Sequence, residues 1–437
     1  MNKKYKKIVA ISLTSLILIL ILYFLLSFKK NLEPNVILIT SDALRTDHLG
    51  CYGYKKETSP FLDSFSKNSF TFTNVITQSA STVPSIASLF TSKYPYSDCV
   101  VDSSYKLGNK NITIAEFLKE KGYKTYAIVG HYYLVKKFGF SRGFNYFNDY
   151  FDKFRNASEM QKSAVELLKK IIKKDKKFFL WLHFREPHSP YTPPAKYRIM
   201  FSEPFTGKNE IRTYTIYGKS MSLSEKAIHE LVTAYDANIR FLDDNLRDLF
   251  EFLESNGLIK KSIIVFTADH GESLGEHDIF DHNELYYGII RVPLIIKIPN
   301  SKGGIVNYPI SLIDIFPTIL NLLGYKNDVL KLKLRGKDIF LNRTPDEIQF
   351  SEYPNSYSII GNNWRLFINK EGGFELYNIK DDPLELNNLI SVKKEKYEFL
   401  KKKLDDIIKK KKPYTEESKI ILDGEDKEKL RSLGYIQ

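Results

Sequence analysis

Short apolar runs alternate with longer segments of helical periodicity along most of the chain. Several runs are bounded by polar residues and match buried parallel strands in length and composition: 36–39, 125–129, 178–182 and 263–266. A further strand is expected at 292–298. Apolar residues at helical spacing predict helices at 113–121, 157–174 and 224–255. This alternation predicts an α/β fold with a mostly parallel central sheet flanked by helices.

The pattern changes beyond about residue 300. A helix is expected at 313–323, a β-hairpin at 364–368 and 374–377, and a Lys-rich helix at 392–410. These elements predict a smaller C-terminal α+β subdomain. We therefore expect a cytoplasmic stub and membrane anchor at 1–30, a main domain at 31–300 and the C-terminal subdomain at 301–437.

The N-terminal segment predicts a transmembrane helix. Residues 8–28 are almost wholly apolar, and their length suits a helix that spans a membrane. The stretch exceeds the apolar core of an ordinary secretory signal and has no small-x-small cleavage site, which favours a retained anchor over a removed signal peptide. More lysines precede it than follow it, so we expect a single-pass protein with a cytoplasmic N-terminus and an extracytoplasmic main domain.

Composition narrows the choice of partners. The 437-residue chain is 43% hydrophobic and carries a net charge of +13. Its basic residues are spread out rather than grouped with aromatics on one element, so no nucleic-acid partner is expected. The two cysteines, Cys51 and Cys99, lack the spacing of a thiolate zinc site. One disulfide or two free thiols are both compatible with the sequence.

Acidic and imidazole side chains follow the predicted strands. Asp42 comes after the first strand, Asp269 and His270 after a later one, and His188 lies on the loop 185–190 after another. The carboxyl ends of parallel strands share one edge of a sheet, so these groups can converge there. Carboxylates with an imidazole suit Zn²⁺, Mn²⁺, Mg²⁺ or Ca²⁺. Each residue also has an alternative role when it is considered alone. Asp42 could cap a helix, His270 could be a buried hydrogen-bonded histidine, and His188 could be a surface residue of the loop.

The segment 81–91 combines hydroxyl residues and Pro84 with an apolar helical pattern. This predicts a helix that begins at or just after Thr82. The positive end of such a helix attracts anions, so the Thr82 hydroxyl could attack a phosphate or sulfate ester. The alternative is that Thr82 only caps the helix.

The motifs together resemble the sulfatase family of the alkaline phosphatase superfamily. The resemblance covers nearly the whole chain after the anchor, and its motifs follow one another in the same order as in the family. It rests on these segments: NVILITSDALRTDHLGCYGY, SASTVPSIASLFTSKYP, FLWLHFREPHSPYTPP, FTADHGESLGEHDIFDHNELYYGIIRVPLII, SLIDIFPTILNLLGY, ELYNIKDDPLELNNLI and KLRSLGYI. It implies an alkaline-phosphatase-like fold whose domain at 31–300 is catalytic.

The resemblance also assigns roles to single residues. Asp42, Asp269 and His270 match metal ligands, and with Thr82 they would hold one divalent ion, Mn, Zn, Ca or Mg. Thr82 matches the nucleophile. Two histidines, His188 and His282, match positions that contact the substrate or its leaving group. Arg45 and His131 are two further candidates for the substrate pocket. Alternatively, Arg45 could form only a salt bridge, and His131 could be an ordinary loop residue.

Departures from the family pattern bear on the chemistry. Sulfatases carry Cys or Ser in C/S-x-P-x-R, which becomes formylglycine, whereas this chain has Thr82 and Ile86 at the first and last of those positions. Threonine cannot form formylglycine. Relatives with Thr here, such as phosphoethanolamine and glycerol-phosphate transferases, act on phosphoesters through a phospho-threonine. The chain also has Ala43 where many relatives have a second Asp.

We therefore expect a sulfatase-family hydrolase that cleaves sulfate or phosphate esters through a covalent intermediate on Thr82, in a small-molecule, lipid-headgroup or glycan substrate. Phosphoesters are favoured over sulfate esters because formylglycine cannot form. One alternative is a transferase that moves a phospho-headgroup to a membrane lipid or a surface glycan. The other alternative is a surface protein that only binds its ligand.

Overall fold

An eight-stranded sheet forms the centre of the computed structural model, with the strands in the order β11-β2-β10-β7-β1-β6-β4-β5. The structure describes residues 33–96, 105–150, 155–174, 177–201, 224–341, 343–411 and 419–432, and the account below concerns the unit Asn35–Gln437. The transmembrane helix predicted at 8–28 lies outside the described residues, as does Cys99. No helix among the described residues is both long enough and apolar enough to cross a membrane.

The central sheet is mostly parallel, as predicted. Its strands are β1 (Asn35–Asp42), β2 (Phe70–Phe72), β4 (Lys124–Val129), β5 (Tyr146–Asn148), β6 (Phe178–Pro187), β7 (Ser262–Ala268), β10 (Leu294–Lys297) and β11 (Gly304–Val306). Strand β1 pairs in parallel with β6 and β7, and β4 with β5 and β6. Strand β10, predicted at 292–298, is antiparallel to both β7 and β2. The segment between β7 and β10 contains no long crossover helix, which is the usual connection between parallel neighbours.

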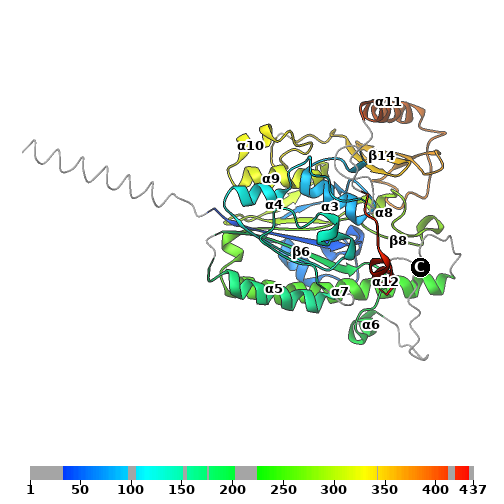
Figure 1. Ribbon diagram of the computed structural model, residues 1–437. Helices are drawn as coiled ribbons and strands as arrows, with labels where there is room; N and C mark the ends of the chain where they lie inside the picture. Colours follow the sequence, from blue (N-terminus) through cyan, green and yellow to red (C-terminus); the bar gives the residue numbers. More distant parts are fainter. Residues whose placement is uncertain are drawn as a thin grey trace, which may run out of the picture. The chain divides into compact units, whose positions relative to one another are not determined.

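Helices cover both faces of the sheet (Figure 1). One face carries α3 (Thr82–Thr91), α4 (Ile114–Glu120) and α9 (Ile315–Leu322), and the other carries α5 (Ala157–Ile171) and α7 (Glu225–Ser255). The predicted helices are thus present. Ser224 caps α7 through its side chain, which accepts from Ala227 N–H. Gly257, with φ of 66°, lies just beyond the end of α7, where a left-handed conformation favours glycine.

The remaining short elements connect these layers. Two pairs of short strands lie outside the central sheet: β3 (Val75–Ile76) with β12 (Ile310–Ser311), and β8 (Ser273–Leu274) with β9 (Phe280–Asp281). The short helices are α2 (Pro60–Ser66), α6 (Ala195–Phe201), α8 (Tyr287–Ile290), α10 (Lys326–Lys331) and α12 (Gly424–Ser432).

Strand β6 is longer than the sequence predicted. We expected a strand at 178–182 and a loop at 185–190, but the strand continues to Pro187. Its pairing with β1 shifts in register between Ser41 and Asp42, so that Asp42 lies opposite Pro187. A proline is tolerated at this point because the regular ladder ends there. The longer strand carries its side chains up to the edge of the sheet where Asp42 lies.

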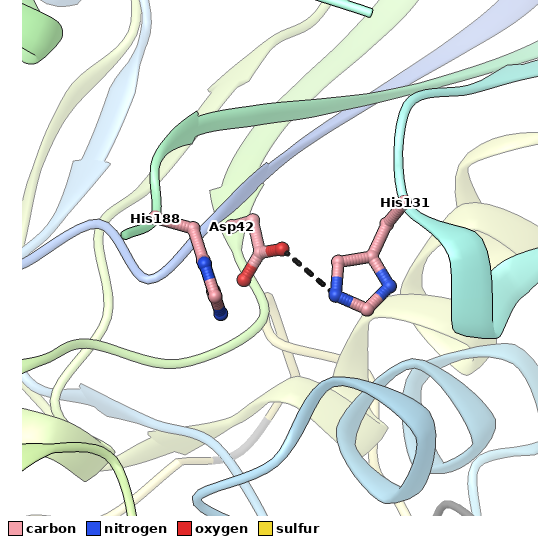
Figure 2. Close-up of side chains that lie close together, drawn as sticks. All are labelled: Asp42, His131 and His188. Carbon is pink, nitrogen blue, oxygen red and sulfur yellow. Dashed lines mark ion pairs between the residues drawn. The ribbon is translucent and has the colours of Figure 1, made fainter. Parts of the chain in front are cut away.

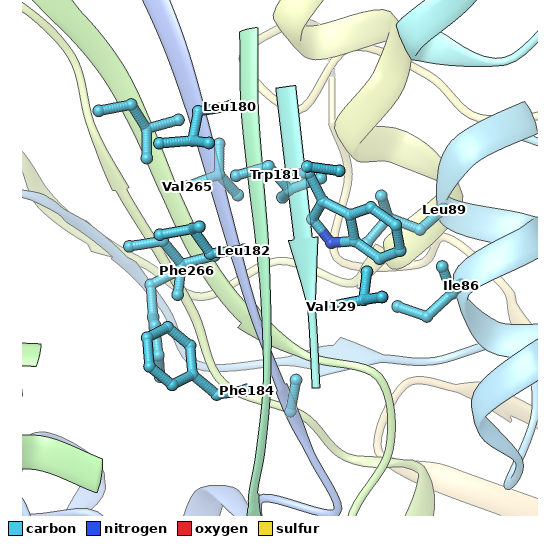
Figure 3. Packing of buried hydrophobic residues seen from close by; sticks show 14 of the residues in the cluster. Ile86, Leu89, Val129, Leu180, Trp181, Leu182, Phe184, Val265 and Phe266 are labelled. Atoms are coloured by element: carbon cyan, nitrogen blue, oxygen red, sulfur yellow. The ribbon is translucent and has the colours of Figure 1, made fainter. Parts of the chain in front are cut away.

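Helix α3 packs against the sheet through a fully buried core. Figure 3 shows Ile86 and Leu89 of this helix beside Trp181 of β6, and all three side chains are buried. Polar contacts fix the first turn as well, since Ser85 Oγ donates a hydrogen bond of 2.6 Å to the Asp269 carbonyl. The beginning of α3 is therefore held directly against the end of β7.

A separate antiparallel sheet follows in the C-terminal region. It contains β13 (Gln349–Tyr353), β14 (Ser356–Gly361), β15 (Trp364–Ile368) and β16 (Phe374–Asn378). Strands β15 and β16 are the predicted hairpin, whereas β13 and β14 were not predicted. Helix α11 (Lys394–Lys410) packs on this sheet through Leu400 and Leu404. This sheet and its helix are the smaller α+β part expected after the main domain.

Candidate active site

Three parallel strands and one helix meet at a single edge of the central sheet. Asp42 ends β1, Asp269 and His270 follow β7, and β6 runs alongside β1 up to the same edge. Thr82 is the first residue of α3. The side chains of these residues are buried, with Thr82 exposed by 5% and the others by 0%. The convergence predicted from strand ends is therefore present.

Of the four residues predicted to hold a metal ion, three lie within 4 Å of the fourth, His270. Thr82 Oγ1 is 3.3 Å from His270 Nε2. The same nitrogen is 3.7 Å from Asp42 Oδ1 and 3.6 Å from Asp269 Oδ2. Thr82 does not cap α3, because Ser81 occupies the N-cap position. Its hydroxyl faces the His270 imidazole instead.

The carboxylates of this cluster fit a divalent cation. Both oxygens of Asp42 and Oδ2 of Asp269 are buried and have no hydrogen-bond partner among the described residues. Burial, and then the neighbouring Asp269 carboxylate, raise the pKa of Asp42 well above its ordinary value. Buried carboxylates are costly unless a positive charge compensates them. Two carboxylates with an imidazole therefore match the donor set of a divalent metal ion.

Hydrogen bonds orient two of the predicted ligands. His270 Nδ1 lies 2.8 Å from the Gly271 carbonyl, so this nitrogen carries the proton and Nε2 presents its lone pair to the cluster. Asp269 Oδ1 accepts from the backbone N–H groups of His270 and Ala43, at 2.7 and 3.2 Å. Ala43 adopts a left-handed conformation with φ of 58°. Oδ2 of Asp269 is thereby left to face Nε2 of His270.

His188 and His282 lie beside the cluster but differ in their hydrogen bonds. His188 Nδ1 donates to the Ser189 carbonyl, which leaves Nε2 with a lone pair. His282 Nδ1 lies 2.6 Å from Asp281 Oδ1 and 3.3 Å from Glu272 Oε1. The His282 ring is centred 4.3 Å from that of His270 and 5.2 Å from that of His188.

These partners set opposite charge states for the two rings. Burial, reinforced by the nearby His282, lowers the pKa of His188 well below its ordinary value. Burial also opposes protonation of His282, but Asp281 and Glu272 outweigh it and raise its pKa well above the ordinary value. The ion pair with His282 overcomes the effect of burial on Asp281 and lowers its pKa to about 2. His188 is therefore a neutral acceptor and His282 a cationic donor.

His131 lies next to both Asp42 and His188 (Figure 2). Its ring centre is 5.9 Å from that of His188, and its Nε2 is 3.4 Å from Asp42 Oδ2. The Tyr133 backbone N–H donates to His131 Nδ1 over 3.2 Å. Because Nδ1 already accepts a hydrogen bond, the proton of the neutral ring is on Nε2 and points to the carboxylate. His131 therefore presents an N–H, not a lone pair, toward Asp42.

Arg45 occupies an ion-pair network next to the site. Its guanidinium pairs with Asp47 at 2.8 Å and with Glu276 at 2.7 Å. It also donates to the Glu272 carbonyl at 3.1 Å. Arg45 thus holds the backbone of the residue whose side chain contacts His282. The guanidinium of Arg45 therefore forms salt bridges within the protein, which is the alternative role considered for it from the sequence.

Sequence reasoning missed three residues that border the cluster. His183 on β6 is fully buried, and its Nε2 lies 3.9 Å from Asp42 Oδ2. Burial lowers the pKa of His183 to about 4, so the ring is neutral near pH 7. Glu272 and Asp281 flank His282. A signal for His183 was available, since it is one imidazole at the end of an otherwise apolar run, FFLWLHF.

Comparisons with known protein families identify the chain. A family model described as Sulfatase matches residues 34–325. The chain belongs to the sulfatase family. A second model, described as N-sulphoglucosamine sulphohydrolase, C-terminal, matches residues 275–413. The expectation of an ester hydrolase is confirmed, and the alternative of a protein that only binds a ligand is not supported.

Similar proteins extend over most of this sulfatase-family chain. The Ulvan-active sulfatase of Formosa agariphila is 28% identical over 94% of this chain and 89% of its own length. The arylsulfatase of Clostridium perfringens is 26% identical, over 85% of this chain and 93% of its own length. The crystal structure of the phosphonate monoester hydrolase of Agrobacterium radiobacter has a TM-score of 0.68 and 18% sequence identity. The match covers 86% of this chain and 96% of that protein's chain. That likeness shows the shared α/β fold.

Proposed function

We propose that this sulfatase-family enzyme is a metal-dependent hydrolase of phosphate esters with Thr82 as its nucleophile. The observation that carries the proposal is the position of the Thr82 hydroxyl, at the beginning of α3 and 3.3 Å from His270 Nε2. Asp42, Thr82, Asp269 and His270 would hold the metal ion. When bound, that ion supplies a positive charge that lowers the pKa of the hydroxyl and offsets the charge of the ester.

The chain's own groups then divide the remaining work. Thr82 Oγ1 forms a bond to phosphorus while the bond from phosphorus to the leaving oxygen breaks. His282 is placed to donate a proton from Nε2 to that oxygen, because its Nδ1 is held by two carboxylates. His188 Nε2, with a lone pair, is placed to accept the proton of the water that releases the phosphoryl group. The N-terminus of α3 favours the anionic ester.

Two residues support phosphate over sulfate as the transferred group. Threonine cannot be converted to formylglycine, so Thr82 itself must be the nucleophile. The position of the family arginine is held by Ile86, which is fully buried and packs in the core beside Trp181 (Figure 3). An arginine there would place its charge in the apolar core of this chain. The local structure around Thr82 therefore lacks both features of the formylglycine site.

Hydrolysis of sulfate esters is the second candidate. It is favoured by the names of the relatives, which include an Ulvan-active sulfatase and an arylsulfatase. A transferase that passes the phosphoryl-bearing group from Thr82 to an alcohol remains the alternative for the second step. We also propose the extracytoplasmic, membrane-anchored location predicted from residues 8–28, which would bring lipid headgroups and surface glycans within reach.

One substrate comparison tests the proposal. The purified full-length enzyme, supplied with Mn²⁺ or Zn²⁺, is assayed on para-nitrophenyl phosphate, its phosphodiester and para-nitrophenyl sulfate, which share one leaving group. We expect faster turnover of a phosphate ester and a loss of at least about a thousandfold in Thr82→Ala. Thr82→Ser is the matched control and should retain part of the activity. Preferred turnover of the sulfate, or full activity in Thr82→Ala, would contradict the proposal.

A further inference from the structure

A fully buried imidazole, His183, faces the metal-binding carboxylates without belonging to the predicted ligand set. Its Nε2 is 3.9 Å from Asp42 Oδ2 and has no hydrogen-bond partner in the described part of the chain. His183 Nε2, an oxygen of Asp42 and an oxygen of Asp269 all lie within 4.8 Å of one another. Ligands of one metal ion are separated by distances of this order.

The hydrogen bonds of Thr40 decide which nitrogen of His183 carries the proton. Thr40 Oγ1 accepts from Trp181 Nε1 at 3.0 Å, lies 2.8 Å from His183 Nδ1 and donates to the Leu182 carbonyl at 3.4 Å. With the single hydroxyl proton directed to the Leu182 carbonyl, Nδ1 of His183 donates to Thr40 and Nε2 carries a lone pair. The other tautomer would put a buried N–H on Nε2, which has no hydrogen-bond acceptor among the described residues.

The resulting arrangement is unstable without a cation. A buried lone pair on His183 Nε2 faces the buried Asp42 carboxylate, and neither group has a hydrogen bond among the described residues. The pattern of Nδ1–H bound to a neighbouring group with Nε2 left open is the usual arrangement of a metal-ligating histidine. We propose that His183 Nε2 is a further ligand of the metal ion held by Asp42, Asp269 and His270.

The neighbouring His131 provides a contrast within the same site. Its Nε2 is even closer to Asp42 Oδ2, at 3.4 Å. Its Nδ1, however, accepts the Tyr133 N–H, so the proton of the neutral ring is on Nε2. A protonated nitrogen cannot bind a metal ion. Of these two imidazoles, His183 is therefore the ligand, whereas His131 presents a protonated nitrogen to Asp42 Oδ2.

The added ligand changes which metal the site prefers. With His183, the donor set has two imidazoles and two carboxylates besides the Thr82 hydroxyl. Imidazole nitrogen suits Zn²⁺ and other transition metals, whereas Ca²⁺ and Mg²⁺ favour oxygen alone. This inference deepens the proposed function by naming the class of metal ion, and we expect the enzyme to select Zn²⁺ over Ca²⁺.

Metal binding tests the inference without any measurement of turnover. The purified full-length enzyme is stripped with a chelator and reloaded with Mn²⁺ or Cu²⁺, and coordinated imidazole nitrogens are counted by pulsed electron paramagnetic resonance. His183→Asn keeps a donor amide near the position of Nδ1 and removes Nε2, and His131→Asn is the matched control. We expect two coordinated imidazoles in the wild type and in His131→Asn, and one in His183→Asn.

Affinity and stoichiometry complete the test. In competition with Ca²⁺, the ratio of Zn²⁺ affinity to Ca²⁺ affinity should fall at least about tenfold in His183→Asn. Each variant should bind one metal ion per chain. Equal imidazole counts in wild type and His183→Asn would overturn the inference, as would two metal ions per chain of which the variant loses one. If phosphate esters were not turned over but these spectra held, the proposed function would fail while the ligand assignment stood.

Discussion

At the scale of single residues, the site separates a donor histidine from an acceptor histidine. His282 is fixed between Asp281 and Glu272, whereas His188 donates its Nδ1 proton to a backbone carbonyl. Two rings whose centres lie 5.2 Å apart thus present an N–H and a lone pair to the same space. Acid and base functions can be assigned from these partners without reference to any relative.

The assignment predicts how leaving groups respond to a change at His282. His282→Asn should slow an alkyl phosphate by about 10²–10⁴-fold, because its leaving oxygen needs a proton, and para-nitrophenyl phosphate much less. The measurement is kcat for both esters in wild type and variant. His282→Lys, which restores a cationic donor, should recover part of the lost rate. Equal losses for the two esters would show that His282 does not act as the acid.

Several site residues could be predicted from the sequence because their positions follow from strand ends. Asp42, Asp269 and His270 each come directly after an apolar run, and parallel pairing brings such positions together. His183 could not be predicted this way, because it lies within the strand. Its role depends on its distance from Asp42, which the register between β1 and β6 determines.

At the scale of elements, α3 connects the hydrophobic core to Thr82, the proposed nucleophile. Every residue from Thr82 to Thr91 is buried, and Ile86 belongs to the same hydrophobic core cluster as Trp181 (Figure 3). The same helix therefore carries the Thr82 hydroxyl on its first turn and a core contact one turn later. Packing of Ile86 should keep Thr82 in position.

This predicts that restoring the family arginine would damage the fold. Ile86→Arg would place an unpaired guanidinium among apolar side chains and should lower the free energy of unfolding by about 3 kcal/mol or more. Ile86→Val, the matched control, should cost about 0.5–1.5 kcal/mol. Urea unfolding of both variants measures the difference. An Arg variant as stable as the Val variant would show that the side chain reaches solvent or an unrecognised partner.

The element boundaries show what local pattern can and cannot predict. Strand β1, helix α4 and the hairpin β15–β16 agree with their predictions because apolar periodicity and turn residues are local signals. The extension of β6 to Pro187 and the direction of β10 depend on which strands pair, and these long-range contacts leave no local signal. The sequence did not predict β13 and β14, which lie in the same antiparallel sheet as β15 and β16.

At the scale of the whole molecule, a buried ion pair connects the C-terminal sheet to the site region. Arg365 of β15 pairs with Glu385 and also donates to the Leu285 carbonyl. Glu385 accepts the Tyr287 N–H at 2.7 Å. Leu285 and Tyr287 follow His282 closely in the chain. The C-terminal region therefore supports the segment that carries the cationic histidine.

We expect this pair to behave as a unit. Arg365→Met should lower the free energy of unfolding by about 3–5 kcal/mol, because it leaves the Glu385 carboxylate buried without its cation. The double variant Arg365→Met/Glu385→Gln should be more stable than Arg365→Met alone. A double-mutant cycle by chemical denaturation measures the coupling. Additive losses would indicate that the two side chains act independently.

The central claim is that Thr82 becomes covalently modified during turnover. Its most direct test is rapid acid quenching of the metal-loaded enzyme with a phosphate ester, followed by peptide mass spectrometry. We predict a phosphoryl group on the peptide that carries Thr82, its accumulation during turnover, and its absence from Thr82→Ala. An unmodified Thr82 peptide in an enzyme that is actively turning over substrate, or a modified residue elsewhere in the chain, would contradict the account.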